Sequence, residues 1–585
     1  MGLVSIVLRF PSPDTQNYIC ADATWHSLLT MQAYSETPSE THKFLPIVTL
    51  GSTDDKDIPW GATIPDQYGN YYYTSFGAFG YFVPYIFVRS FNLPISEQSL
   101  YIFNSALYLL CFSLTVVLML KLFDEKLPKW LIIIISTLYL FQPEILHSQG
   151  IVYWYQSLFQ FVFLLQLILF INLQGKWRYI AFFLLCLVAP YLEWTGYVSN
   201  VGFAVALFMK SGVSANKEYV QLCTEKLIKS VVVLVLTILS FALFVVHYLT
   251  VVEKTTFYNA LVKRFGARSF SAGGATLKAL ATGYMSSFGI LIIITAIVLV
   301  IALFISATRT ALRNEFSDQH IVLFVTVFAL LENLIMRQHA IAYTFDRMKA
   351  VFPLLIILVL CISAVYTVLK KPIYRQVLTC IICVAVFIVS GISLKNYVTD
   401  NNHFKWDAPY LQTNRAIAEQ LISEYTPENS IYVQEKAVRG YTNLLFGRGV
   451  YENVTLEKAI PIAQTQSKRY IVELNITGGA WNMYEYSDYT VLDLQSLDDT
   501  VLNITDGNWE KGVKIAGNVL LFANTPQYKE KLIANNPQTI SVKDGGAVYT
   551  EKIVSVKEYG SYIWLTLEDN ADKWKFQYPK ALFCE

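Results

Sequence analysis

The chain has 585 residues, of which 54% are hydrophobic and only 15% are charged, and its formal net charge is +1. With a mean hydropathy of +0.40, it is too apolar for a soluble globular protein and is predicted to be an integral membrane protein. The net charge gives no general case for nucleic-acid binding. Eight cysteines in a chain of this length do not make a disulfide framework.

The chain opens with an apolar stub, MGLVSIVLRF, which as a helix covers about 15 Å, roughly half of a hydrocarbon core. The stub has no basic leading region and no small-residue cleavage site, so we do not expect a signal peptide. We expect the first membrane span to be cut short here. Residues 11–76 then form a long loop rich in Pro, Gly, Asp and Asn.

One stretch of this loop, CADATWHSLLTMQAY (20–34), predicts a helix. Its spacing puts Asp22, His26 and Thr30 on one polar face, and Trp, Leu and Leu at positions 25, 28 and 29 on the other. A carboxylate that faces polar space beside an apolar surface is a candidate base, and we assign His26 to substrate binding. The alternative is that Asp22 only caps the helix, because Asp is a favoured N-cap residue.

Membrane segments fill the next part of the chain. Residues 75–91 are apolar but interrupted by Gly and Pro, which is typical of a helix in the membrane interface or of a re-entrant segment. Ten uninterrupted apolar runs follow and predict spans, several of them shorter than an ideal span. The runs are 101–122, 130–142, 151–173, 179–190, 195–209, 229–250, 287–306, 320–335, 349–368 and 376–393.

Short loops rich in Lys and Arg fall on alternate turns between these runs, and the positive-inside rule makes them cytoplasmic. By parity, the outer side holds residues 11–100, the turns 143–150, 191–194 and 336–348, the loop 251–286, and everything after about residue 394.

Two of the outer loops break the charge rule. The loop 251–286 holds five cations, and the turn near 336–348 holds three more. Clustered guanidinium and ammonium groups at a membrane surface are suited to a phosphate or pyrophosphate head group, so we assign Lys263, Arg264 and Arg268 to substrate binding. The alternative is a solvated loop that faces lipid head groups.

The turn after the run 320–335 is a second polar constellation. On a helical reading, His339, Tyr343 and Asp346 share one face, with Arg347 adjacent. Ionisable groups at membrane depth are costly, so all four are candidate substrate-binding residues. The alternative is a pair of structural salt bridges at a helix end.

Carboxylates also occur at two other outer turns. Glu193, in APYLEWTGY, interrupts an apolar region and is a candidate for binding a substrate hydroxyl or orienting a base. Glu144 and His147 border another outer turn and fit ordinary surface residues equally well. The chain has no Walker motif, dinucleotide fingerprint, HExxH motif or zinc-ligand spacing.

The composition becomes that of a soluble domain after residue 395. Residues 396–496 alternate helix-like and strand-like patterns and predict an α/β subdomain. Residues 497–585 read as successive strands and predict a β-rich subdomain. The predicted fold is therefore a polytopic α-helical membrane domain, residues 1–395, with a C-terminal extracytoplasmic α/β and β-rich domain.

In chain order, the sequence has an acidic residue in a long first outer loop, the aromatic segment YYYTSFGAFGYFVPYIF, the span NSALYLLCFSLTVVLMLKLF, many short spans and a terminal outer domain. This order resembles the GT-C superfamily of polyprenyl-phosphate-dependent glycosyltransferases. The layout is most similar to its bacterial protein-mannosyltransferase-like and aminoarabinose-transferase-like members. The resemblance covers roughly residues 1–395.

The resemblance implies an enzyme of the bacterial inner membrane that moves a sugar from a polyprenyl-phosphate donor to a hydroxyl of a glycan or protein by inverting displacement. It maps the catalytic base onto Asp22. The chain departs from the usual paired acidic motif, because Asp22 is followed by Ala-Thr-Trp-His. Asp54, Asp55 and Asp66 therefore compete for the role of base, and a divalent metal stays open.

Three rival functions remain at this stage. A polysaccharide polymerase or ligase would take a pyrophosphate-linked donor. A lipid-sugar transporter or flippase would share the spans and the ionisable outer loops, but it should show internal repeats, and we find none. A non-enzymatic membrane anchor would present the C-terminal domain as a binding module.

Overall fold

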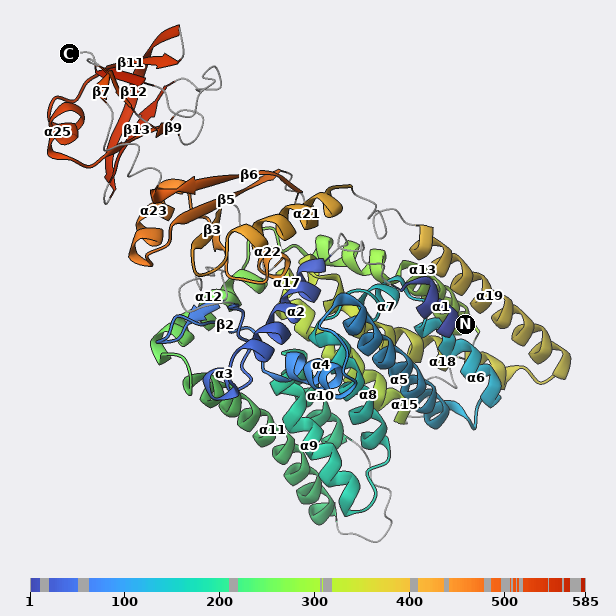
Figure 1. The fold of residues 1–585 in the computed structure, drawn as a ribbon. Helices are drawn as coiled ribbons and strands as arrows, with labels where there is room; N and C mark the ends of the chain where they lie inside the picture. The colour runs from blue at the N-terminus through green and yellow to red at the C-terminus, as the bar shows by residue number, and fades with distance from the viewer. Residues whose placement is uncertain are drawn as a thin grey trace. The chain divides into compact units, whose positions relative to one another are not determined.

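The computed structural model describes residues 2–10, 20–50, 63–209, 219–305, 308, 318–399, 409–435, 441–477, 485–495, 505–506, 509–511, 513–514, 519–544, 547–559, 562–568 and 580–583. The chain divides into two compact units (Figure 1). Met1–Thr49, Pro59–Ala408 and Arg439–Tyr441 form the membrane unit, and Leu50–Ile58, Pro409–Val438 and Thr442–Glu585 form the C-terminal unit.

Helices occupy all ten apolar runs, because in each run a long stretch of apolar side chains coincides with good backbone propensity for helix. They are α5 (Glu97–Phe123), α6 (Lys129–Ser136), α8 (Tyr155–Ile171), α9 (Lys176–Leu192), α10 (Thr195–Met209), α11 (Tyr219–Leu249), α13 (Leu277–Phe304), α15 (Asp318–Ala329), α18 (Val351–Val368) and α19 (Pro372–Thr399).

Six stretches of the described residues are long and apolar enough to cross a membrane, and three shorter apolar helices accompany them. The six are Glu97–Phe123, Thr224–Leu249, Leu277–Phe304, Asp318–Ile335, Thr344–Val368 and Pro372–Tyr397. The protein is a multi-pass helical membrane protein, and this part of the predicted fold class is confirmed.

Helix α13 differs from its predicted run in two ways that matter for the site. It begins at Leu277 rather than at residue 287, so its first turns belong to the segment that was predicted as outer loop. It also breaks at Phe288, whose φ of −138° and ψ of 15° are not helical. Such a kink changes the direction in which the neighbouring side chains point.

The first loop supplies several short elements to the membrane unit. They are α1 (Gly2–Leu8), α2 (Ala21–Glu36), α3 (Ser39–His42), the antiparallel pair β1 (Thr63–Pro65) and β2 (Tyr71–Tyr73), and α4 (Phe79–Ser90). At 12 residues, α4 covers about 18 Å and is too short to span a hydrocarbon core. Further short elements are η1 (Thr137–Tyr139), α7 (Pro143–Ser148), α12 (Lys254–Arg268), α16 (Leu331–Ile335), α17 (Arg337–Ala342) and η2 (Thr344–Ala350).

Helix α2 is buried around most of its circumference. Its predicted polar face is not open, since His26 and Thr30 are as buried as Leu29 on the opposite face. The helix starts after Cys20, which has a left-handed backbone with φ of 62° and makes no side-chain cap. Asp22 lies inside the first turn, so it is not the N-cap residue.

The C-terminal unit contains two sheets. In the four-stranded sheet, β3 (Ser430–Gln434) runs parallel to β4 (Tyr451–Glu452) and β5 (Tyr470–Thr477), and β6 (Glu485–Asp493) pairs antiparallel to β5. Helices α21 (Pro409–Glu424), α22 (Tyr441–Phe446) and α23 (Leu456–Thr465) accompany this sheet in the chain. The second sheet has eight strands in the order β7-β8-β14-β11-β12-β13-β10-β9.

The strands of the larger sheet are β7 (Thr505–Asp506), β8 (Trp509–Lys511), β9 (Val513–Lys514), β10 (Val519–Ala523), β11 (Thr539–Asp544), β12 (Ala547–Tyr559), β13 (Tyr562–Leu567) and β14 (Lys580–Phe583). Between β10 and β11 lie α25 (Pro526–Tyr528) and the π-helix η3 (Lys529–Ala534). One apolar core contains residues of both sheets, among them Ile431, Val433, Leu521 and Trp564. The β-rich C-terminal region of the predicted fold class is confirmed.

A single buried amide organises the turn between α7 and α8 in the membrane unit. Asn104 of α5 donates from Nδ2 to the carbonyl oxygens of Ser148, Gly150 and Val152, at 3.2, 2.9 and 2.7 Å. Because buried carbonyl groups need donors, this one side chain fixes the path of the backbone beside α7.

We therefore expect Asn104→Ala to lower the free energy of unfolding by about 1–3 kcal/mol, since it leaves buried carbonyls without their donor. Thermal unfolding of the purified protein in detergent measures the change. Ser113→Ala is the control, because Ser113 is an exposed residue of the same helix that bonds only to Leu109 O. An unfolding midpoint of Asn104→Ala equal to that of the control would contradict this role.

Candidate functional site

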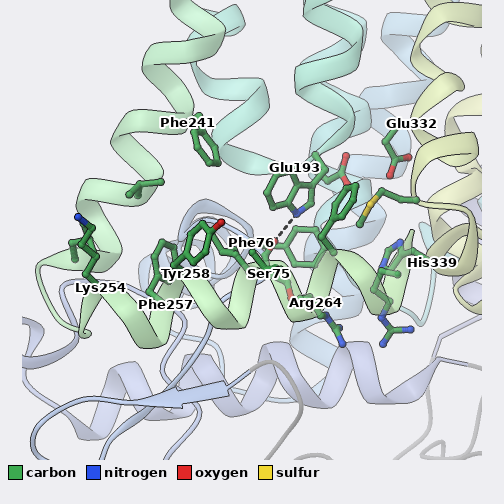
Figure 2. Close-up of a pocket in the computed structure, with 18 residues that line it drawn as sticks. Ser75, Phe76, Glu193, Phe241, Lys254, Phe257, Tyr258, Arg264, Glu332 and His339 are labelled. Atoms are coloured by element: carbon green, nitrogen blue, oxygen red, sulfur yellow. Dashed lines mark hydrogen bonds between the residues drawn. The ribbon is translucent and has the colours of Figure 1, made fainter. Parts of the chain in front are cut away.

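The membrane unit contains a pocket of about 520 Å³ between α11, α12, the segment after β2, the turn after α9, and α16–α17. One end of the pocket is apolar and the other is charged (Figure 2). Phe241, Val245 and Leu249 of α11 and several side chains of α12 form the apolar end. At the charged end lie Glu193, Arg264, Arg268, Glu332 and His339.

The apolar end is built from the end of a membrane span and a helix with two kinds of face. α11 contributes the last turns of the span Thr224–Leu249. On α12, Phe257 is buried, whereas Val262 and Phe265 are more than half exposed although both line the pocket. Exposed apolar side chains beside a span are expected to face lipid, so a hydrocarbon chain could enter this end from the bilayer.

The two arginines of the charged end are held by neutral groups. Arg264 donates from Nε to Ser75 Oγ at 3.0 Å and from Nη2 to Tyr73 OH at 2.9 Å. Arg268 donates to Gln338 Oε1 at 3.0 Å and to Tyr343 OH at 3.1 Å. Within the described part of the chain, neither guanidinium forms an ion pair with a carboxylate. Their charge is therefore available to an anionic ligand.

Three carboxylates form a buried cluster at the same end of the pocket. Glu193, Glu332 and Asp346 offer oxygen atoms that all lie within 4.8 Å of one another. Lys349 Nζ lies 2.7 Å from Glu332 Oε2 and 3.2 Å from Asp346 Oδ1. The salt bridges that the sequence offered as an alternative are therefore present, although they involve Lys349.

His339 joins this cluster to the arginines. Its Nδ1 lies 3.2 Å from Asp346 Oδ2, and its ring packs on Tyr343, which accepts a hydrogen bond from Arg268. Burial lowers the pKa of His339, although Asp346 acts in the opposite direction. The imidazole is therefore neutral near pH 7.

A second polar neighbourhood surrounds the start of α2. The backbone and hydroxyl of Thr344 hydrogen-bond to the Cys20 thiol, and the charges of Asp22 and Glu144 both act on that thiol. His147 Nδ1 lies 3.4 Å from Thr344 Oγ1 and 4.0 Å from Glu144 Oε1. The partly exposed Asp22 thus lies near another carboxylate and near the turn that carries Arg347.

Glu144 is a functional candidate that sequence reasoning left as a surface residue. It is buried, and it accepts hydrogen bonds from Ser148 Oγ and, at 2.9 Å, from Ser287 Oγ. Arg347 Nε donates to the same Ser287 Oγ at 3.1 Å, so the serine links the guanidinium to the carboxylate. The kink of α13 immediately follows Ser287. In the sequence, the only hint was that Glu144, His147 and Ser148 share the i, i+3, i+4 spacing of one helix face.

His26 lies between the two neighbourhoods as a buried ring. It packs on Tyr73, Tyr81 and Trp154, and its Nε2 lies 3.2 Å from the Tyr81 hydroxyl. Burial and, secondarily, the charge of Arg264 lower the pKa of His26 to about 3. His26 is thus a neutral spacer between α2 and the tyrosine that binds Arg264.

The other sequence candidates fall into three groups. Lys263 is exposed and does not line the pocket, whereas Lys254 does. Asp66 is used by its own turn, where it accepts from the backbone N–H groups of Tyr68 and Asn70. Asp54 and Asp55 lie outside the described residues.

The single helix expected around 336–348 is wrong. α17 ends at Ala342, Tyr343 is extended, and a 3-10 turn, η2, follows. His339 and Asp346 meet all the same, because the chain folds back at Tyr343 and returns Asp346 toward α17. Arg347 points elsewhere, to Ser287 and to the carbonyl oxygen of Ala340.

No protein-family model and no curated protein sequence matches the chain. Its fold is similar to three solved structures. An oligosaccharyltransferase from Archaeoglobus fulgidus, in complex with Zn and sulfate, shares 14% identity at a TM-score of 0.47, over 81% of this chain and 67% of that one. ArnT from Cupriavidus metallidurans bound to undecaprenyl phosphate shares 11% identity at 0.47, over 96% of both chains.

The apo form of the same ArnT shares 11% identity at a TM-score of 0.46, over 98% of both chains. Likenesses of this degree do not establish an activity. Function therefore has to be inferred from the pocket and the side chains around it.

The packing of Cys20 against Thr344 can be tested by thiol labelling. Burial, reinforced by Asp22, raises the pKa of Cys20 to about 12. At pH 8 only about one thiol in ten thousand is then ionised, against about one in ten for an ordinary exposed thiol. In a variant that keeps Cys20 as its sole cysteine, we expect a maleimide to react about 10³-fold more slowly in the native protein than in denaturant. Equal rates would show that the start of α2 does not pack on η2.

Proposed function

We propose that the protein is an integral-membrane glycosyltransferase. It transfers a sugar from a polyprenyl-phosphate donor to an acceptor hydroxyl, with inversion at the anomeric carbon. The observation that carries the proposal is the pocket itself, in which an apolar end reaches the lipid and two arginines held by neutral groups occupy the other end.

The donor fits the pocket by chemistry. Its isoprenoid chain lies against Phe241, Phe257 and their apolar neighbours, and its phosphate lies between Arg264 and Arg268. A guanidinium matches phosphate in charge and in fork geometry, and here each is pre-oriented by neutral acceptors. Glu193, His339 and Tyr343 are then placed to bind hydroxyl groups of the donor sugar.

Asp22 is the proposed base. The acceptor hydroxyl attacks the anomeric carbon and gives its proton to Asp22, while the bond between that carbon and the phosphate oxygen breaks and polyprenyl phosphate leaves. Arg264 and Arg268 stabilise the negative charge that grows on the leaving phosphate. Glu144, anchored to Arg347 through Ser287, is the second carboxylate of this centre and orients the acceptor.

The positive-inside pattern supports an orientation in which the site and the C-terminal unit face the extracytoplasmic side of a bacterial inner membrane. Donor sugar and acceptor stay unassigned, and the acceptor is either a glycan or a protein.

Asp22→Asn should lower the transfer rate by about 10²–10⁴-fold, the usual contribution of a general base, without loss of the folded protein. The assay incubates purified protein in lipid with a panel of sugars linked to polyprenyl monophosphate or pyrophosphate, and detects free polyprenyl phosphate. Asp124→Asn is the matched control, because Asp124 is exposed at the other end of α5. Transfer by Asp22→Asn at the control rate would remove Asp22 from this role.

Arg264→Gln and Arg268→Gln should each weaken binding of polyprenyl phosphate by about 10–100-fold, since each removes charge-assisted hydrogen bonds worth about 1.5–3 kcal/mol. Lys263→Gln is the control, because it removes the same charge from the same helix outside the pocket. Quenching of tryptophan fluorescence by added polyprenyl phosphate measures binding, since Trp194 lines the pocket. Equal weakening by all three variants would indicate a general surface-charge effect and would contradict the proposed phosphate site.

A further inference from the structure

The carboxylate cluster beside the pocket is short of positive charge. Glu193, Glu332 and Asp346 are buried, and Lys349 is the only Lys or Arg within ion-pair distance of them among the described residues. With His339 neutral, three negative charges face one positive charge. Burying a net charge of about −2 is strongly unfavourable, so the cluster requires further neutralisation.

A second observation points to a ligand in the same place. Gln156 is only 4% exposed, and its amide nitrogen lies 3.4 Å from Glu193 Oε1 and 3.4 Å from Asp346 Oδ1, so the side chain reaches into the cluster. Its carbonyl oxygen Oε1 is buried and has no hydrogen-bond partner. Asp346 Oδ2 is also buried and accepts no hydrogen bond of good geometry. A buried oxygen acceptor without a donor is costly.

We propose that this cluster is a binding site for a hard divalent cation, Mg²⁺ or Mn²⁺, held by the carboxylates of Glu193, Glu332 and Asp346 and by the carbonyl oxygen of Gln156. All four ligands are oxygen atoms, the set that these ions prefer. Rotation of the Gln156 amide by half a turn brings Oε1 to the carboxylates in place of Nε2.

Charge and access both agree with the ion. Three carboxylates, one ammonium and one divalent cation sum to zero. Lys349 pairs with Glu332 Oε2 and Asp346 Oδ1, which leaves Glu332 Oε1 and Asp346 Oδ2 outside its ion pairs. The ion reaches the site through the pocket, because Glu193 and Glu332 line its wall. The site is separate from Asp22 and Glu144, and ion binding does not depend on the proposed transferase activity.

The test uses full-length protein in detergent, stripped of metal, and titrated with Mn²⁺ under electron paramagnetic resonance. We expect one bound Mn²⁺ per chain, displaced by Mg²⁺. Glu193→Gln and Glu332→Gln should each weaken binding by at least about 10–100-fold, the loss seen when even outer-sphere partners of a metal are removed. Asp22→Asn and Glu144→Gln are the controls and should leave Mn²⁺ affinity unchanged.

Fe²⁺-mediated oxidative cleavage of the wild type maps the same ion without any variant, and it keeps the test decisive if the glutamine variants do not fold. Backbone cuts near residues 193, 332 and 346 support the site, and cuts confined to the neighbourhood of residues 22 and 144 overturn it. Absence of bound Mn²⁺ in the folded wild type, from mildly acidic to mildly basic pH, also overturns it and shows that protons neutralise the cluster. Unchanged affinity in folded Glu193→Gln and Glu332→Gln does the same.

Discussion

The constraint on which the membrane unit depends is the need to satisfy charged side chains that one short turn carries into an apolar interior. η2 buries Asp346, Arg347 and Lys349 within four residues. Each unpaired charge there would be very costly, so each recruits partners from a different element. Asp346 meets α17 and α8, Arg347 meets α13, and Lys349 meets α16. The turn thereby fixes the helices that surround the pocket.

The cations near the pocket divide into two classes by their partners. Lys349 is used by the carboxylates that it neutralises, and such buried pairs contribute specificity of packing more than stability. Arg264 and Arg268 are oriented instead by hydroxyl and amide oxygens, which hold the guanidinium groups without cancelling their charge. Only the second class retains an attraction for an anionic head group, which is why the phosphate belongs to α12 and not to η2.

Sequence reasoning was sufficient where the signal is local. The ten apolar runs are helical because hydrophobic length is a property of each segment by itself. The selection of Arg264, Arg268, His339 and Glu193 also worked as a guide to the pocket, since a charge in an apolar loop is visible in the sequence. The burial of Glu144 was not predictable, because its partner Ser287 lies 143 positions away, on a helix that kinks there. The chain reversal at Tyr343 was missed for the same reason, because long-range partners of η2 override the helical spacing.

The burial of α2 also explains why its first turn is the part suited to chemistry. The middle of the helix is covered by the rings of Tyr73, Tyr81 and Trp154, so a titratable group such as His26 is held neutral there. Asp22, at the start of the helix, keeps partial exposure and lies where the helix dipole favours negative charge. A base must be ionised and reachable, and on this helix only its first turn meets both conditions. The same rings pass from His26 to Tyr73 and so to Arg264, which ties the position of the base to the position of the phosphate site through packed side chains.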